Sequence, residues 1–425
     1  MSQADTHRAI DTVWRTESSR LIASLTRMLR DVGLAEELAQ DALVVALEQW
    51  PRAGVPENPG AWLMTTAKRR AIDRLRRSKL LERKHAQLVH ELEHEQEHAQ
   101  SAVEAALDDP FGDDLLRLIF VACHPLLSME ARVALTLRLL GGLSTDEIAR
   151  AFLIPEPTVA QRIVRAKRSL AKAAVAYEVP RGDELQQRLS SVLGVIYLIF
   201  NEGYSATAGD DLMRPALCED ALRLGRVLAG LMPGEAEVHG LVALMEIQAS
   251  RADARVDAQG EPILLLEQDR LLWDHLQIRR GLAGLEQARL LGGADGHYAL
   301  QAAIAACHAR AADAAQTDWP QIAELYARLA AVTGSPIVEL NRAVAVGMAA
   351  GAAAGLELVD ALTDEPSLQR YHLLQAVRGD LLERMGRHGE ARIAFERAAA
   401  LTMNRREREL MTRRALGCAA PAPSA

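Results

Sequence analysis

The spacing of apolar residues most restricts how this chain can fold. Two early series recur at intervals of three or four positions: Leu21, Leu25, Met28 and Leu29, and then Leu34, Leu38, Ala42 and Val45. Such spacing places apolar side chains on one face of an α-helix. No long run alternates with the period of a β-strand, and aromatic residues make up only 4% of the chain. We therefore predict an all-α protein.

Length and cysteine spacing narrow the class of protein further. A chain of 425 residues with 49% hydrophobic residues can bury two or three cores, so several domains are expected. The cysteines form no C-x-x-C pair, which argues against a disulfide framework and a zinc ribbon. Neither a membrane span nor a signal peptide is recognisable. We expect a cytoplasmic protein with no metal, no cofactor and no membrane partner.

The net charge of -8 conceals two basic clusters. Residues 68–84 contain nine Lys and Arg side chains against Asp73 and Glu82, and residues 158–172 contain five and no acid. Binding to phosphates depends on the local release of counterions and not on the total charge. Both clusters therefore indicate contacts with nucleic acid.

The most specific local pattern lies at residues 143–170. The residues from Ser144 to Glu147 have the pattern of a capping box. The side chain of Ser144 can accept a hydrogen bond from the backbone amide of Glu147, and the side chain of Glu147 can accept one from the amide of Ser144. In the helix that starts there, the side chains predicted to face the protein interior are Ile148, Ala149 and Phe152. Pro155 then ends it, because proline cannot continue the hydrogen-bond ladder and disfavours helical backbone before it.

A second helix is predicted to open near Pro157, which suits a first helical turn. One apolar stripe on it consists of Val159, Ile163, Ala166 and Leu170. The side chains predicted to reach phosphates and base edges are Thr158, Gln161, Arg162, Arg165 and Arg168. A basic, solvent-exposed helix of a bundle shows the same pattern, so the segment alone leaves both interpretations open.

The chain divides by pattern into three domains. A first helical domain spans residues 7–78, and a polar linker rich in Glu, His and Gln spans 79–112. A second compact unit covers 113–176, and an Ala-rich, acidic region covers 183–416. The tail at 417–425 is expected to be disordered.

Two segments of the first domain resemble region two of the extracytoplasmic-function class of sigma-70 factors. The segment from Gly33 to Leu43 is similar to the family helix that binds the clamp helices of the largest RNA polymerase subunit. The resemblance assigns polymerase contacts to Glu36, Glu37, Gln40 and Asp41. The basic segment that follows is similar to the helix that engages and melts the minus-ten element. The DNA-binding residues that this implies are Trp62, Lys68, Arg69, Arg70, Arg74, Arg76 and Arg77.

The turn-rich segment 51–60 is predicted to break the helical pattern before a further helix begins near Ala61. By resemblance, residues 52–60 occupy the place of the family loop that captures a flipped base, with Trp62 beside it. A plain core role for Trp62 is an equal alternative. Most members place Asn where Arg69 stands, so a contact made by that Asn is not carried over.

Residues 113–176 resemble region four, whose helix-turn-helix reads the minus-thirty-five element. The resemblance covers about the first 180 residues of the chain. It implies an alternative sigma factor that binds core RNA polymerase, recognises promoter DNA and initiates transcription, tuned by its third domain. The rival interpretation is a helix-turn-helix regulator with a repeat-based sensor domain, which needs no polymerase-binding helix.

Residues 372–403 resemble a tetratricopeptide repeat. Its packing positions hold Gly379, Leu382, Ala391, Phe395 and Ala398, whereas Gln375 and Met403 depart from the usual Trp and Pro. One repeat cannot bury its own face. Segments 299–316 and 338–362 are therefore predicted to be degenerate partners in a helical stack.

Two clusters in the third region, residues 197–204 and 267–274, resemble segments of a sigma-factor subgroup with a tetratricopeptide-like extension. Genes of that subgroup commonly neighbour small DGPF-type (YCII-related) proteins, which makes such a protein a candidate partner. The clusters fit either a ligand or docking pocket or a hydrogen-bonded structural network, and the network is favoured. Its predicted members are Asn201, Glu202, Asp269 and Arg270.

The motif H-E-x-x-H occurs at residues 90–94 and again at 94–98. A zinc protease needs this motif on a buried helix with a third ligand, whereas here it lies in a polar tract where chance matches are frequent. No Walker loop, G-x-S-x-G elbow or dinucleotide fingerprint is present. We expect no enzymatic activity.

Overall fold

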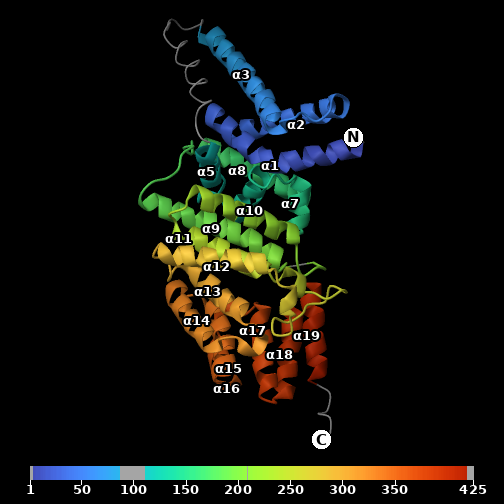
Figure 1. Ribbon diagram of the computed structural model, residues 1–425, viewed down its shortest axis with the longest axis vertical. Helices are drawn as coiled ribbons and strands as arrows, with labels where there is room; N and C mark the ends of the chain where they lie inside the picture. Colours follow the sequence, from blue (N-terminus) through green and yellow to red (C-terminus); the bar gives the residue numbers. More distant parts are fainter. Residues whose placement is uncertain (1–2, 87–110, 208, 419–425) are drawn as a thin grey trace. The chain divides into compact units, whose positions relative to one another are not determined.

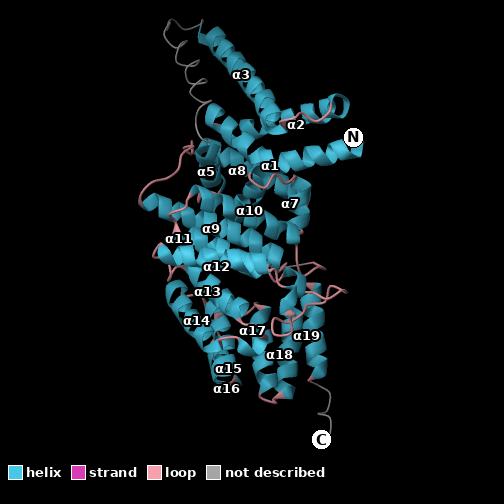
Figure 2. Ribbon diagram, in the orientation of Figure 1, coloured by secondary structure: helices cyan, strands magenta, loops and turns pink. Residues whose placement is uncertain are grey.

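The computed structural model describes residues 3–86, 111–207 and 209–418. Within these ranges the regular elements are helices joined by loops, and pairing of the β type is limited to two isolated bridges (Figure 2). The prediction of an all-α protein is confirmed. The chain divides into two compact units, unit 1 from Met1 to Ile196 and unit 2 from Tyr197 to Ala425 (Figure 1).

Unit 1 opens with three helices that correspond to the first predicted domain. They are α1 (Gln3–Leu29), α2 (Val32–Ala53) and α3 (Pro59–Ala86). Their shared core includes Leu21, Leu25, Leu38, Ala42, Trp50 and Leu63. Half of the apolar series read from the sequence is therefore buried, and the other four residues, Met28, Leu29, Leu34 and Val45, are half-buried. Helix α3 runs eight residues beyond the predicted domain end at 78.

Helix α2 does not end where the sequence predicted. The turn-rich segment was expected to break the helix from Pro51, but α2 continues through that proline to Ala53. Proline removes one backbone bond near the end of the helix, and the amide of Gly54 still donates to the carbonyl of Trp50 at 2.9 Å. A loop of residues 54–58 follows, and Asn58 Oδ1 then accepts from the amide of Ala61 in the first turn of α3.

Four shorter helices form the second part of unit 1. They are α5 (Phe111–Ala122), α6 (Met129–Leu139), α7 (Thr145–Phe152) and α8 (Glu156–Lys172). Helix α9 (Asp183–Tyr204) follows, and its first half packs with them. Arg188 Nη2 donates to the carbonyl of Phe120 at 2.9 Å, and Ser191 Oγ donates to the carbonyl of Cys123 at 2.7 Å. These bonds join the start of α9 to unit 1, although the sequence placed it in the C-terminal domain.

Unit 2 is a succession of packed helices. They are α10 (Pro215–Leu231), α11 (Ala236–Ala249), α12 (His275–Leu290), α13 (His297–Arg310), α14 (Trp319–Thr333), α15 (Pro336–Ala350), α16 (Ala352–Ala361), α17 (His372–Arg384), α18 (His388–Leu401) and α19 (Arg405–Gly417). Helical neighbours along the chain pack against one another. The segments 299–316 and 338–362 supply α13 and most of α15 and α16, as expected for members of a helical stack.

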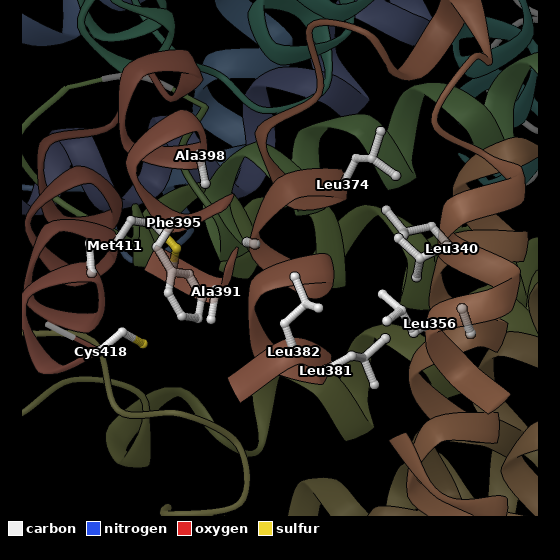
Figure 3. Packing of buried hydrophobic residues seen from close by; sticks show 14 of the residues in the cluster. Leu340, Leu356, Leu374, Leu381, Leu382, Ala391, Phe395, Ala398, Met411 and Cys418 are labelled. Atoms are coloured by element: carbon white, nitrogen blue, oxygen red, sulfur yellow. The ribbon is translucent and has the colours of Figure 1, made fainter. Parts of the chain in front are cut away.

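The core of α15 to α19 consists mainly of leucines and alanines and includes the ring of Phe395, with Met411 and Cys418 of the last helix segment (Figure 3). Helices α17 and α18 form the hairpin predicted from the repeat pattern, with Leu382, Ala391, Phe395 and Ala398 completely buried. Gly379 lets the two helices approach, because a Cβ there would lie 2.7 Å from the ring of Phe395. The small and large residues of the repeat pattern therefore have the packing roles expected of them.

Candidate nucleic-acid interface

The helix-turn-helix begins with the predicted capping box. Ser144 Oγ accepts from the amide of Glu147 at 3.1 Å, and Glu147 Oε2 accepts from the amide of Ser144 at 2.8 Å. Burial raises the pKa of Glu147, but these bonds and the nearby Arg15 outweigh it and lower the pKa. Ile148 and Ala149 are buried as predicted, whereas Phe152 is only half-buried. The start of α7 is therefore held by its own sequence.

The turn between α7 and α8 uses a residue that the sequence did not single out. Leu153 ends α7 in the left-handed region, with φ of 51°, and its side chain is exposed. Pro155 caps the next helix, and Pro157 lies in its first turn. The turn therefore combines a leucine with left-handed backbone angles and a proline that disfavours helical angles at the residue before it. Only the proline was predictable from the sequence.

Helix α8 separates its apolar and polar residues as predicted. The buried stripe is Val159, Ile163, Ala166 and Leu170. On the other faces Gln161, Arg165 and Arg168 are exposed, while Thr158 and Arg162 are half-buried. Exposed Gln and Arg side chains at this spacing can reach phosphates and base edges in a major groove. The structure therefore presents three of the five predicted residues fully to solvent.

The basic face of α3 is divided between exposed and engaged side chains. Arg69, Arg74 and Arg76 are exposed. Arg70 forms an ion pair with Asp41 of α2, with 2.9 Å between Nη1 and Oδ2. Lys68 is half-buried, and burial together with the charge of Arg27 lowers its pKa. Arg69, Arg74 and Arg76 are thus the best placed for phosphate contacts.

Two of the sequence predictions concern positions that lie partly or wholly outside the described residues. The backbone of Arg77 belongs to α3, but its side chain lies outside the described residues. The two H-E-x-x-H motifs at 90–98 also lie outside them. Within the described ranges, no group of three or more His, Cys, Asp or Glu side chains is arranged to hold a metal ion. Nor does any helix there have the length and apolar character to cross a membrane.

Trp62 lies at the start of α3, beside the loop of residues 54–58. It is half-buried, and its ring meets the ring of Trp50 edge to face, with 5.4 Å between centroids. Trp50 itself is completely buried. Trp62 is therefore packed against a core residue and still partly accessible, a position that suits both roles considered from the sequence.

Helix α2 carries the residues predicted to bind polymerase, and they fall on two faces. Glu37 is exposed, and Gln40 and Asp41 are half-exposed one turn further on. On the same face the sequence analysis missed two apolar side chains, Val44 and Leu47, which are 51% and 40% exposed. Residues three and four apart are neighbours on a helix surface, so these five form one continuous stripe. We call it the outer face of α2.

Glu36 points the other way, into the contact between α2 and the helix-turn-helix. Its side chain is only 4% exposed. Its Oε1 accepts from Arg138 Nε at 2.6 Å, and its Oε2 pairs with Lys167 of α8. Gln40 Nε2 also donates to Glu36 Oε1, at 2.6 Å. The structure therefore separates Glu36 from Glu37 and Asp41, while Gln40 bonds Glu36 from the edge of the outer face.

The two clusters singled out in the third region differ in exposure: Glu202 of the first is buried, whereas Asp269 and Leu271 of the second are exposed. Glu202 pairs with Arg214 and accepts from the hydroxyl of Thr207 at 2.9 Å. Asp269 accepts from the amide of Leu271, and Arg270 donates to the carbonyls of His308 and Ala311 at the end of α13. Asn201 bonds the hydroxyl of Tyr197. These bonds support a structural network at Glu202 and Arg270. Asp269, Arg270 and Trp273 of the second cluster also line a cavity of about 700 Å³, so the pocket interpretation has support there as well.

Three protein families match parts of the chain, two of them within unit 1. The model of sigma-70 region 2 matches residues 13–80, and the model of sigma-70 region 4 matches residues 117–170. A family of unknown function, DUF6596, matches residues 188–289. The chain is an extracytoplasmic-function sigma factor with a C-terminal extension. The sequence predictions of regions two and four are confirmed.

Relatives of this sigma factor match either nearly the whole chain or a smaller part of it. A functionally uncharacterized protein of Rhizobium meliloti (strain 1021) is 42% identical over 399 residues, which is 94% of this chain and 93% of that protein. The ECF RNA polymerase sigma factor SigK of Mycobacterium ulcerans (strain Agy99) is 28% identical over 156 residues, 36% of this chain and 78% of SigK.

A shorter match to a named sigma factor has a higher identity. SigK of Mycobacterium sp. (strain KMS) is 45% identical over 62 residues, which is 14% of this chain and 31% of SigK. No solved structure matches the chain. The sigma factor therefore shares its extension with the Rhizobium meliloti protein, whose match spans nearly the whole chain.

Proposed function

We propose that this sigma factor binds core RNA polymerase through the outer face of α2. The face joins acidic and amide groups to two exposed apolar side chains, Val44 and Leu47. Exposed apolar residues ringed by polar ones are typical of a surface that a partner protein covers. Glu37 and Asp41 add charges that favour a basic partner surface.

We further propose that α3 holds the minus-ten element and α8 reads the minus-thirty-five element. On α3 the exposed Arg69, Arg74 and Arg76 are available to phosphates, and Arg70 would exchange its bond to Asp41 for one to DNA. Trp62 lies where an unstacked base can rest on its accessible part.

The observation that carries this proposal is the segregation of side chains on α8. Four apolar residues anchor the helix, while Gln161, Arg165 and Arg168 remain exposed opposite them. A helix that is buried on one face and basic on the other is the form that enters a major groove.

Charge reversal on α8 tests the proposal. Arg165→Glu should lower run-off transcription by the polymerase holoenzyme by about tenfold to a hundredfold, the usual cost of losing an arginine contact to a base. Arg392→Glu on α18, also an exposed arginine on a helix, is the matched control and should transcribe normally. Normal transcription from Arg165→Glu would contradict the assignment. Specific duplex binding by the wild type that never recruits polymerase would favour a helix-turn-helix regulator.

Unit 2 is proposed to tune these interactions. Its helical stack carries the match to DUF6596 at 188–289, which includes both clusters that resemble the sigma-factor subgroup. That resemblance supports a small DGPF-type (YCII-related) protein as a partner of unit 2, and co-elution of the two purified proteins in size-exclusion chromatography tests it. We propose a cytoplasmic location, where polymerase and promoter DNA are found, and a role in binding without covalent chemistry.

A further inference from the structure

A cavity of about 700 Å³ lies in unit 2, between residues 266–278 and residues 309–315. Its volume is within the range of about 300–1,000 Å³ that is typical of sites for small molecules. All of its lining residues belong to unit 2, so the cavity is complete within that unit.

Small side chains on one wall leave this space unfilled. Residues 309–315 include five alanines, and the other wall includes Leu266, Trp273 and Ile278. Leu271 also lines the cavity and is 85% exposed. A large apolar side chain that stands in water beside a cavity is one that the apolar part of a ligand would cover.

Three arginines bring positive charge to this part of unit 2. Arg270 and Arg310 line the cavity. The guanidinium groups of Arg270 and Arg251 lie over the ring of Trp273, at 4.9 and 5.8 Å from its centroid. Among the residues that the structure describes, none of the three arginines forms an ion pair with a carboxylate. Because arginine stays protonated, these charges are not neutralised within the described part of the protein.

The two carboxylates of the lining are held in turns instead. Asp269 Oδ1 accepts from the amide of Leu271 at 2.9 Å. Asp313 Oδ1 accepts from the amides of Ala315 and Gln316 at 2.9 and 3.0 Å, and its Oδ2 accepts from Gln316 Nε2 at 2.7 Å. The aspartates therefore cap the two short helical turns beside the cavity and do not pair with its arginines.

A buried histidine next to the cavity is affected by the same positive charge. Burial lowers the pKa of His308, and the charges of Arg251 and Arg270 lower it further. Its Nδ1 is buried without a hydrogen-bond partner in the described part of the chain. Cationic groups without an adjacent carboxylate favour an anion from solution, because hydrogen bonds between charged groups are strong in such surroundings.

We propose that this cavity of unit 2 binds a small organic anion with an apolar body. The body would lie against Leu271 and the alanines of residues 309–315, and Arg310 would donate to the anionic group while Arg270 adds its charge at the same site. The inference goes beyond the polymerase and promoter contacts proposed above and does not depend on them.

Isothermal titration calorimetry of the full-length protein tests the proposal with four probes. Naphthoate and octanoate are anions with a flat and a flexible apolar body, and naphthamide and octanamide keep these bodies without the charge. At about pH 7 both carboxylates are ionised. Wild type should bind at least one anion about tenfold or more tightly than the matching amide, as expected for hydrogen bonds to a charged group.

Two variants locate the site. Arg310→Met removes an exposed cationic donor and should weaken binding of the anion by about tenfold, while the amide binds as before. Arg397→Met, an exposed arginine of α18 outside the lining, is the matched control and should bind the anion as wild type does. Ala312→Trp enlarges an exposed residue of the lining and should weaken binding of anion and amide alike by about tenfold or more.

Three results would overturn the proposal. They are no binding of either anion by wild type up to about 1 mM, equal affinity for anion and amide, and unchanged affinity for the anion in Arg310→Met or in Ala312→Trp. All three are read without polymerase or DNA, so they are distinct from failure of the proposed promoter contacts. A sigma factor that transcribes as proposed but shows any of them loses only the ligand site.

Discussion

The residues singled out from the sequence differ between unit 1 and unit 2 in their exposure and in their hydrogen-bond partners. In unit 1 seven of the fifteen marked side chains that are described are exposed, among them Glu37 of α2, Arg69 of α3 and Arg165 of α8. In unit 2 the marked residues Glu202 and Arg270 bond other parts of the same unit. Charged residues in a basic amphipathic helix are thus a better indication of exposed side chains than a compact mixture of charge and aromatic rings.

The largest expected effect tests the inward role of Arg270. Arg270→Met removes the bonds to the carbonyls of His308 and Ala311 and to the Thr317 hydroxyl, and should lower the free energy of unfolding of unit 2 by about 3 kcal/mol. Urea unfolding followed by circular dichroism measures it. Arg310→Met, an exposed arginine on α13, should cost little. Equal, small losses in both variants would contradict the structural role.

A pH dependence sharpens the same contrast. Burial, with the charges of Arg251 and Arg270, lowers the pKa of His308 to about 4. Unfolded histidine titrates near 6.5, so between about pH 6.5 and 4 the unfolded state binds the extra proton and stability falls as pH falls. The loss should reach about 2 kcal/mol at pH 5 relative to pH 7. Unfolding of His308→Gln should lack this component, and an unchanged pH profile would refute it.

The outward role of α2 predicts a loss of affinity without a loss of stability. Val44→Asp should weaken binding to core polymerase by about tenfold, since an apolar side chain central to an interface typically contributes 1 kcal/mol or more. Val332→Asp, with a similarly exposed valine on α14, is the control and should bind normally. Fluorescence anisotropy of the labelled protein measures both. Equal binding by wild type and Val44→Asp would exclude this face.

The smallest effect concerns the turn of the helix-turn-helix. Leu153→Gly should stabilise unit 1 by about 0.5–1 kcal/mol, because glycine adopts the positive φ of this position without strain and little buried apolar area is lost. Ala171→Gly, inside α8, should instead destabilise by about 1 kcal/mol. Thermal unfolding distinguishes the two signs. A destabilising Leu153→Gly would show that the leucine makes contacts worth more than the strain.

Local patterns were predictable from the sequence and distant contacts were not. The capping box from Ser144 to Glu147 and the buried stripe of α8 depend only on neighbouring residues, and both appear as expected. The burial of Glu36 depends on Arg138, 102 positions away, and no local rule separates it from Glu37. The continuation of α2 past Pro51 was missed because the loss of one backbone bond near a helix end costs little.

The fold of unit 2 was predictable in class and only partly in detail. The repeat pattern located the α17 and α18 hairpin through Gly379 and Phe395, whose close contact requires a residue without a side chain. The direction of Arg270 was not predictable, because its partners are carbonyl groups of another helix rather than side chains with a sequence signature.

The most direct test of the account is run-off transcription with core RNA polymerase on a promoter fragment from the genome that encodes this protein. The account predicts a transcript that appears only when the full-length protein is added and that disappears with Arg165→Glu. Specific binding of the protein to the duplex with no transcript under the same conditions would contradict it.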